Sequence, residues 1–111
     1  MIKFKKILLL SLLTTGLSQF PQVILAQEGE TLVQEAMCYA CHQMERVSLG
    51  PPWQAIAARH NTRKELMTEV LAGKIVRGGG GNWGIVPMVP NQRVSQEQAR
   101  IMAEWVLEQV P

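Results

Sequence analysis

One pentapeptide constrains the fold of this chain more than any other stretch: Cys38, Tyr39, Ala40, Cys41 and His42 follow one another. Two thiols separated by two residues, with a histidine directly after the second, form the attachment pattern for haem c. Each thiol can add to one of the two vinyl groups at the haem edge, and the histidine can then ligate the iron through a ring nitrogen. The pattern therefore predicts one covalently bound haem per chain, which the rest of the sequence must surround.

Three other functions of this motif compete with haem attachment. A thioredoxin-like dithiol requires a βαβ context, which no part of the sequence predicts. A zinc site requires four ligands, and Cys41 and His42 are too close in sequence to fit one tetrahedron well. The available Cys and His residues are Cys38, Cys41, His42 and His60. A structural disulfide would close a very small loop and would leave the adjacent histidine without a role.

The N-terminal part of the chain is organised like a secretory signal peptide. Three lysines lie within residues 1–6, and an almost unbroken apolar run follows over residues 7–13. We predict cleavage after Ala26, although the residue three positions before that cut is larger than usual. The alternative is an uncleaved membrane anchor, but the apolar run is shorter than the about 20 helical residues that span a bilayer. The predicted organisation is a cleaved signal peptide over 1–26 and one domain over 27–111.

Removal of that peptide changes the charge of the chain. The whole sequence carries 11 Lys and Arg against 9 Asp and Glu, a formal net charge of +2. Three of the lysines precede the cut, so the domain keeps 8 basic and 9 acidic residues and a net charge of −1. It has no basic stripe interleaved with aromatic residues, so we expect no nucleic acid partner. With about 85 residues left, the core is marginal alone, and a buried cofactor would stabilise it.

Helical patterns dominate the domain and predict an all-α fold, since no segment shows the sustained alternation of a strand. Apolar residues at helical spacing predict a first helix from about Glu30 to Ala40. A second helix is predicted to start near Asn61 or Thr62, either of which could cap it, and to end at Gly73.

Two more helices and one long loop complete the predicted domain. The run Ser95–Gln98 has a capping-box pattern and opens a helix that carries apolar residues through Leu107. A short helix over Trp53–Arg59 follows two prolines, which a helix tolerates in its first turn. In the segment Gly78–Asn91, glycines and prolines exclude a helix or a central strand. Its apolar residues and its tryptophan predict that this loop folds against another part of the molecule.

The far face of the haem iron requires a second ligand. The candidates are Met37, Met44, Met67, Met88, Met102 and His60. The first two methionines are too close in sequence to His42 to reach the opposite face. Met67 and Met102 lie on apolar helix faces, where methionine usually fills a core. The histidine follows a short helix, where a solvent-facing or capping role is the default interpretation. Met88 lies between two prolines in the loop, and these observations favour it as the ligand.

A set of short motifs spread over residues 30 to 110 resembles those of a known family. They are Cys38 to His42, Leu49-Gly50-Pro51, Lys74-Ile75, Gly78, Gly81, Trp83-Gly84, Pro87-Met88, Pro90-Asn91 and Ala103 to Leu107. The combination is similar to that of the short bacterial class I cytochromes c, and nearest to the small periplasmic electron shuttles of the c-551 type. The resemblance implies an all-α fold in which helices wrap around one covalently bound haem, with a long Gly/Pro-rich ligand loop.

The resemblance also implies roles for individual residues around the iron. His42 and Met88 are implied to be the axial ligands, and Cys38 and Cys41 the covalent attachment points. Pro51 is implied to offer its carbonyl oxygen to the outer ring N–H of His42, a contact that fixes the orientation and basicity of the ring.

Further roles concern the edge of the haem and the helix packing. The haem propionates are implied to contact the indole N–H of Trp83 and the head group of Lys74 or Arg77; for the tryptophan, simple packing is the alternative. Trp105 is implied to pack on the first helix and the haem as part of the core. Relatives often have a small residue where this chain has Met37, so we expect the first and last helices to cross less closely here.

An iron with both axial positions filled has no open site for a substrate, so we expect an electron carrier and not an enzyme. The resemblance implies a shuttle in the periplasm between redox proteins. The donor would be a quinol-oxidising complex or a dehydrogenase, and the acceptor a terminal oxidase or reductase. The mature protein is expected to be a soluble monomer, with the thylakoid lumen as the alternative location. The alternative functions are a haem subunit held permanently in a larger oxidoreductase complex, and a ligand sensor or weak peroxidase from which Met88 dissociates.

Overall fold

The computed structural model describes residues 20–111, so most of the predicted signal peptide lies outside the described residues. The helical elements of this part are α1 (Phe20–Glu35), η1 (Cys38–Ala40), α2 (Trp53–His60), η2 (Asn61–Arg63), α3 (Lys64–Arg77) and α4 (Gln96–Leu107). Within residues 20–111 the only β-type pairing is one isolated antiparallel bridge between Gly79 and Met88. The predicted all-α fold is confirmed.

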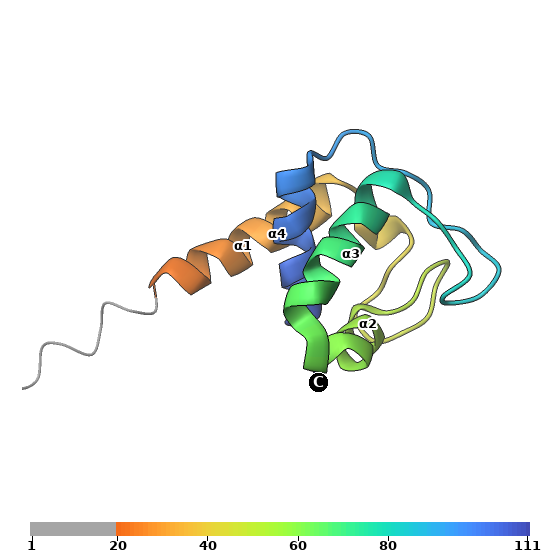
Figure 1. Cartoon of the computed structure of the whole chain (residues 1–111), viewed down its shortest axis with the longest axis horizontal. Coiled ribbons are helices and arrows are strands. Elements are labelled where there is room, and N and C mark those ends of the chain that lie inside the picture. The colour runs from red at the N-terminus through yellow and green to blue at the C-terminus, as the bar shows by residue number, and fades with distance from the viewer. Residues whose placement is uncertain (1–19) are drawn as a thin grey trace, which may run out of the picture.

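Helix α4 is the centre of the domain, because α1, α2 and α3 all contact it (Figure 1). Ser95 caps its N-terminus: the Ser95 hydroxyl accepts a hydrogen bond from the Gln98 amide, and the Gln98 side chain accepts one from the Ser95 amide. This is the predicted capping box. The buried residues contributed by all four helices form one cluster, which comprises Val33, Trp53, Ile56, Ala72, Ile75, Ala99, Met102, Ala103, Trp105 and Val106.

Helices α1 and α4 cross closely at Gly29, and a wider crossing than in relatives stays a prediction. A side-chain carbon added at Gly29 would lie 2.5 Å from Cβ of Trp105 and 3.2 Å from the carbonyl oxygen of Ile101. The small residue that permits the approach is therefore Gly29 within α1, and not a residue beside the cysteine motif. Helix α1 also runs through Ala26, and cleavage after that residue stays a prediction.

The first helix ends earlier than predicted. Helix α1 stops at Glu35, and Met37 has a left-handed backbone with φ 59° and ψ 29°. A residue in this conformation cannot continue a right-handed helix. The chain then makes a single tight turn, η1, which contains Cys38 and is followed directly by Cys41, so neither cysteine lies on α1.

The second predicted helix is wrong at both ends. Helix α3 follows η2 and has no side-chain cap; Arg63 stands at its N-cap position in place of Asn61 or Thr62. The helix runs past Gly73 to Arg77, and Gly78 ends it with φ 71°. Glycine costs a helix interior about 1 kcal/mol relative to alanine, but Ala72 before Gly73 and Ile75 just after it are both buried in the core, and their packing outweighs that cost.

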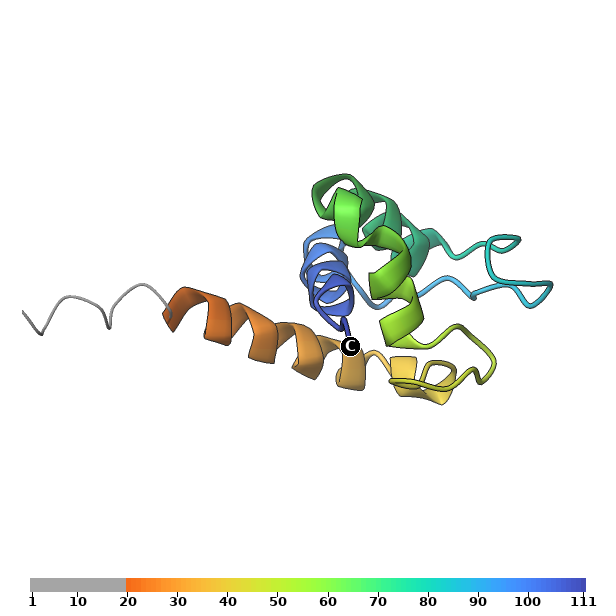
Figure 2. The ribbon, with the colours of Figure 1, turned by 90° about the horizontal axis from the view of Figure 1, so that it is seen from below.

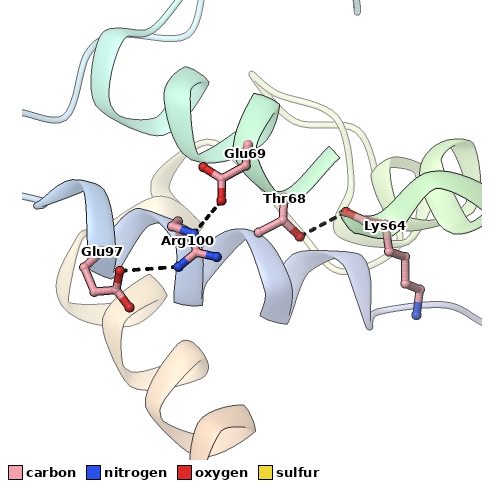
Figure 3. Close-up of polar contacts among 5 residues, drawn as sticks. All are labelled: Lys64, Thr68, Glu69, Glu97 and Arg100. Atoms are coloured by element: carbon pink, nitrogen blue, oxygen red, sulfur yellow. Dashed lines mark hydrogen bonds and ion pairs between the residues drawn. The ribbon is translucent and has the colours of Figure 1, made fainter. Parts of the chain in front are cut away.

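A polar contact also joins α3 to α4 (Figure 3). Arg100 on α4 reaches Glu69 on α3 at 2.5 Å and Glu97 on its own helix at 3.5 Å. The Thr68 hydroxyl donates to the carbonyl oxygen of Lys64 at 3.0 Å, which satisfies a buried hydroxyl within α3. Of these contacts, the Arg100–Glu69 pair links α3 and α4 across a partly exposed surface.

Both long loops leave the helices on the same side of the molecule. The loop between η1 and α2 and the loop between α3 and α4 project away from the free end of α1 in two perpendicular views (Figures 1 and 2). The first loop follows His42, and the second carries Met88. None of the helices in residues 20–111 combines the length and the apolar character needed to cross a bilayer.

Candidate functional site

The cysteine motif is presented by a single tight turn. The amides of Cys41 and His42 both donate to the carbonyl oxygen of Cys38, at 3.1 and 3.0 Å. Both cysteines are half-buried and free. Burial raises the pKa of the Cys38 thiol, a backbone hydrogen bond opposes that rise, and Cys41 adds to it. The turn therefore offers two separate thiols that are available to form bonds.

His42 is buried, with 8% of its surface exposed. Its Nδ1 lies 2.7 Å from the carbonyl oxygen of Pro51. A carbonyl oxygen can only accept, so Nδ1 carries the proton and Nε2 keeps its lone pair. Burial lowers the pKa of the imidazole, against the opposing effect of the Pro51 hydrogen bond. The lowered pKa favours the neutral ring and the hydrogen bond fixes its orientation, and a neutral, oriented imidazole is the form that ligates a metal.

Two further residues hold the His42 ring in place. The indole of Trp53 stacks on the imidazole with ring centroids 4.4 Å apart and an interplanar angle of 20°. On Gly50, a side-chain carbon would lie 2.5 to 3.0 Å from three atoms of the same ring. The sequence reasoning missed the role of Trp53. The signal available was an aromatic residue two positions after Pro51 at the start of a helix.

Met88 is anchored at the base of the Gly78–Asn91 loop. Its backbone exchanges two hydrogen bonds with Gly79, at 3.0 and 2.7 Å. The Asn91 amide donates to the carbonyl oxygen of Ile75 at 3.0 Å, and the Asn91 side chain donates to the carbonyl oxygen of Ala36 at 3.3 Å. The Met88 side chain packs against the core cluster. The loop base is thus fastened to α3 and to Ala36, the residue that follows α1.

The tip of this loop, residues 80–87, is exposed. Trp83 is 44% exposed and Ile85 is 99% exposed, so the prediction that the loop folds against the molecule is right for its base and wrong for its tip. Arg59 on α2 reaches the tip: its Nη1 donates to the carbonyl oxygen of Asn82 at 3.1 Å, and its guanidinium lies 4.8 Å from the centre of the Trp83 rings. Trp83 therefore contacts Arg59 of α2, and its role at the haem stays a prediction.

Lys74 and Arg77 differ in what they face. Nζ of Lys74 lies 2.7 Å from the position that a side-chain carbon on Gly79 would take, so the ammonium lies at the loop base. The guanidinium of Arg77 instead folds back along α3 onto Gly73. Of the two predicted cations, Lys74 is the one that the fold directs toward the loop.

The remaining candidate ligands lie elsewhere. Met67 and Met102 are buried in the core, as predicted. His60 is 9% exposed and its Nδ1 has no hydrogen-bond partner, so the solvent-facing or capping interpretation is wrong. Burial lowers the pKa of His60, and the positive charges of Arg59 and Arg63 lower it further. In residues 20–111 no three His, Cys, Asp or Glu side chains gather around one point, so nothing there supports a zinc site.

Comparison with known proteins gives close relatives. No family model matches the chain. Cytochrome c-551 of Stutzerimonas stutzeri is 40% identical over 102 residues, which cover 92% of this chain and 96% of that protein. Cytochrome c-552 of Nitrosomonas europaea is 42% identical over 82 residues, or 74% of this chain and 79% of that protein.

Solved structures agree with these relatives. The crystal structure of wild-type cytochrome c552 of Nitrosomonas europaea superposes with a TM-score of 0.66 at 40% sequence identity, and the match covers 70% of this chain and 95% of that one. A mutant of the same protein that lacks one residue superposes with a TM-score of 0.67 at 38% identity.

Proposed function

This chain belongs to the family of small class I cytochromes c-551 and c-552, and we propose that Cys38 and Cys41 bind its one haem, with His42 and Met88 as axial ligands. It is a mono-haem electron carrier and not an enzyme. The observation that carries the assignment is the His42 ring, which is buried, is held at Nδ1 by the Pro51 carbonyl oxygen at 2.7 Å, and directly follows two free thiols.

The residues present fit this cofactor. When bound, the haem supplies an iron that alternates between Fe(II) and Fe(III). The Pro51 carbonyl oxygen accepts a hydrogen bond from Nδ1 of His42, with 2.7 Å between the two atoms, which would make the imidazole a stronger donor to the iron and favour Fe(III). The thioether of Met88 is a soft ligand and favours Fe(II). The two ligands therefore oppose each other, and together they set the reduction potential.

Two side chains are suited to the haem propionates. Lys74 directs its ammonium to the loop base, and Trp83 has an exposed indole whose N–H can donate to a carboxylate. A cation and a neutral donor near the propionates would hold their negative charge close to the iron without leaving it unpaired.

We place the mature protein in the periplasm, because the sequence begins with a signal-peptide pattern and the relatives are bacterial cytochromes. Its partners are redox proteins: a quinol-oxidising complex or a dehydrogenase as donor, and a terminal oxidase or reductase as acceptor. The alternative, a permanent subunit of an oxidoreductase complex, differs in one observable: such a subunit would not purify alone.

The test of the ligand assignment compares Met88→Ala with His60→Ala. We expect Met88→Ala to lose the weak far-red sulfur-to-iron band, to lower the reduction potential and to gain binding of external ligands, while it keeps the covalent haem. His60→Ala should change none of these. If the first variant behaves like the wild type and the second alters both spectrum and potential, Met88 is not the ligand.

A further inference from the structure

We propose that Arg59 is a positioning residue that latches the tip of the Gly78–Asn91 loop to α2, and so limits how often Met88 leaves the iron. The proposal rests on Met88 being the axial ligand, as proposed above. Its own evidence is the pair of contacts that Arg59 makes with the loop and the way in which the rest of the loop is held.

The loop base and the loop tip are held differently. At the base, Met88 is hydrogen-bonded to Gly79, and Asn91 is hydrogen-bonded to Ile75 in α3 and to Ala36 just after α1. For residues 80–87, in contrast, the polar side-chain contacts recorded in the described part of the chain are those of Arg59. These residues are exposed, so packing adds little. Removing one side chain should therefore release the tip but leave the base in place.

The chemistry of the latch requires arginine. The guanidinium donates from Nη1 to the carbonyl oxygen of Asn82 at 3.1 Å while its carbon lies 4.8 Å from the Trp83 ring centre. A planar fork can make an in-plane hydrogen bond and present its face to an aromatic ring at the same time. A lysine ammonium is a compact point charge, and it could contact only one of these two partners at a time.

Helix α2 connects the two sides of the proposed site. At its N-terminal end Trp53 stacks on His42, and at its C-terminal end Arg59 holds the loop that carries Met88. These residues are six positions apart on one continuous helix. The turn that carries one proposed ligand and the loop that carries the other are therefore both fastened to the same short rigid element.

Loss of the Arg59 contacts should change the rate at which an external ligand binds the iron. An external ligand can bind the iron only when the Met88 sulfur has left it, and a freer loop tip makes that opening more frequent. Losing one exposed cation–π contact and one hydrogen bond should speed opening by about five- to tenfold. Covalent attachment of the haem and the His42 ligation should not change.

The test measures the rate of imidazole binding to the ferric holoprotein by stopped flow. The variant is Arg59→Gln and the control is Arg63→Gln, which removes the same charge four residues away on η2, where the side chain is exposed. We expect Arg59→Gln to bind imidazole about five- to tenfold faster than the wild type, and Arg63→Gln to match the wild type. Arg59→Lys, which can keep only one of the two partners, should give a rate between those of the wild type and Arg59→Gln.

A double-mutant cycle separates the latch from a general loss of stability. If Arg59 acts through Trp83, Arg59→Gln should have much less effect on the rate in a Trp83→Leu background. Equal rates for Arg59→Gln and Arg63→Gln, or the same acceleration in both backgrounds, would overturn the latch. A wrong ligand assignment would give a different result: the far-red band of the wild type would persist in Met88→Ala.

Discussion

Replacing Gly50 with alanine tests how tightly the proposed iron ligand is held. The added methyl carbon would lie 2.5 Å from Cε1 and 2.8 Å from Nδ1 of His42. The shorter distance is about 0.9 Å less than the 3.4 Å at which ordinary contact begins. The ring cannot move away freely, because the Trp53 face lies 4.4 Å from it, centre to centre. It can yield only by weakening the 2.7 Å hydrogen bond with Pro51.

The expected cost follows from that geometry. Overpacking of a buried site usually costs about 1–3 kcal/mol of unfolding free energy, and we expect Gly50→Ala to fall in this range. The reduction potential should rise, because a weaker hydrogen bond from Nδ1 makes the imidazole a poorer donor to Fe(III). Chemical denaturation of the ferric protein and a spectroelectrochemical titration measure the two effects. Ser48→Thr, which adds a methyl group to an exposed side chain two residues away, is the control. Equal stability and equal potential in the two variants would refute the reasoning.

Two further predictions concern folding and pH. Replacing both Cys38 and Cys41 with alanine should abolish cooperative melting in far-UV circular dichroism, because a core of about 85 residues is marginal without its haem; a helical apoprotein that melts cooperatively would contradict this. The pKa of His60 is lowered from its ordinary value of 6.5 in the folded state, so the unfolded chain binds more protons below that pH. The unfolding free energy should therefore fall as the pH drops below 6.5, and His60→Gln should reduce that slope in urea titrations; an unchanged slope would exclude His60 as its source.

Local chemistry explains which helix ends were predictable. Ser95 and Gln98 carry their capping signal in four residues, and the structure forms it as predicted. The glycine at position 73 predicts the end of a helix, but α3 continues through it because Ala72 and Ile75 pack in the core cluster. The left-handed backbone of Met37 could not be predicted from the sequence either, since glycine and asparagine are the residues that usually take that conformation. Tertiary packing overrides local preference in both cases.

In the candidate site, too, contacts between residues close in sequence could be predicted, and contacts between distant residues could not. The cysteine motif and the Pro51 carbonyl are within ten residues of His42, and the hydrogen bond between His42 and Pro51 that the family resemblance implied is present. The contact of Arg59 with the loop tip spans 23 residues. It depends on where α2 ends relative to the loop, and no pattern along the chain encodes that distance.

The central claim is that Cys38 and Cys41 hold a haem through covalent bonds. The most direct measurement is to denature the mature protein in acid, extract it with an organic solvent, and determine where the haem goes. We predict that the haem stays with the polypeptide, because thioether bonds survive acid and unfolding does not release them. Haem that passes into the organic phase, or a purified protein that contains none, would contradict the claim.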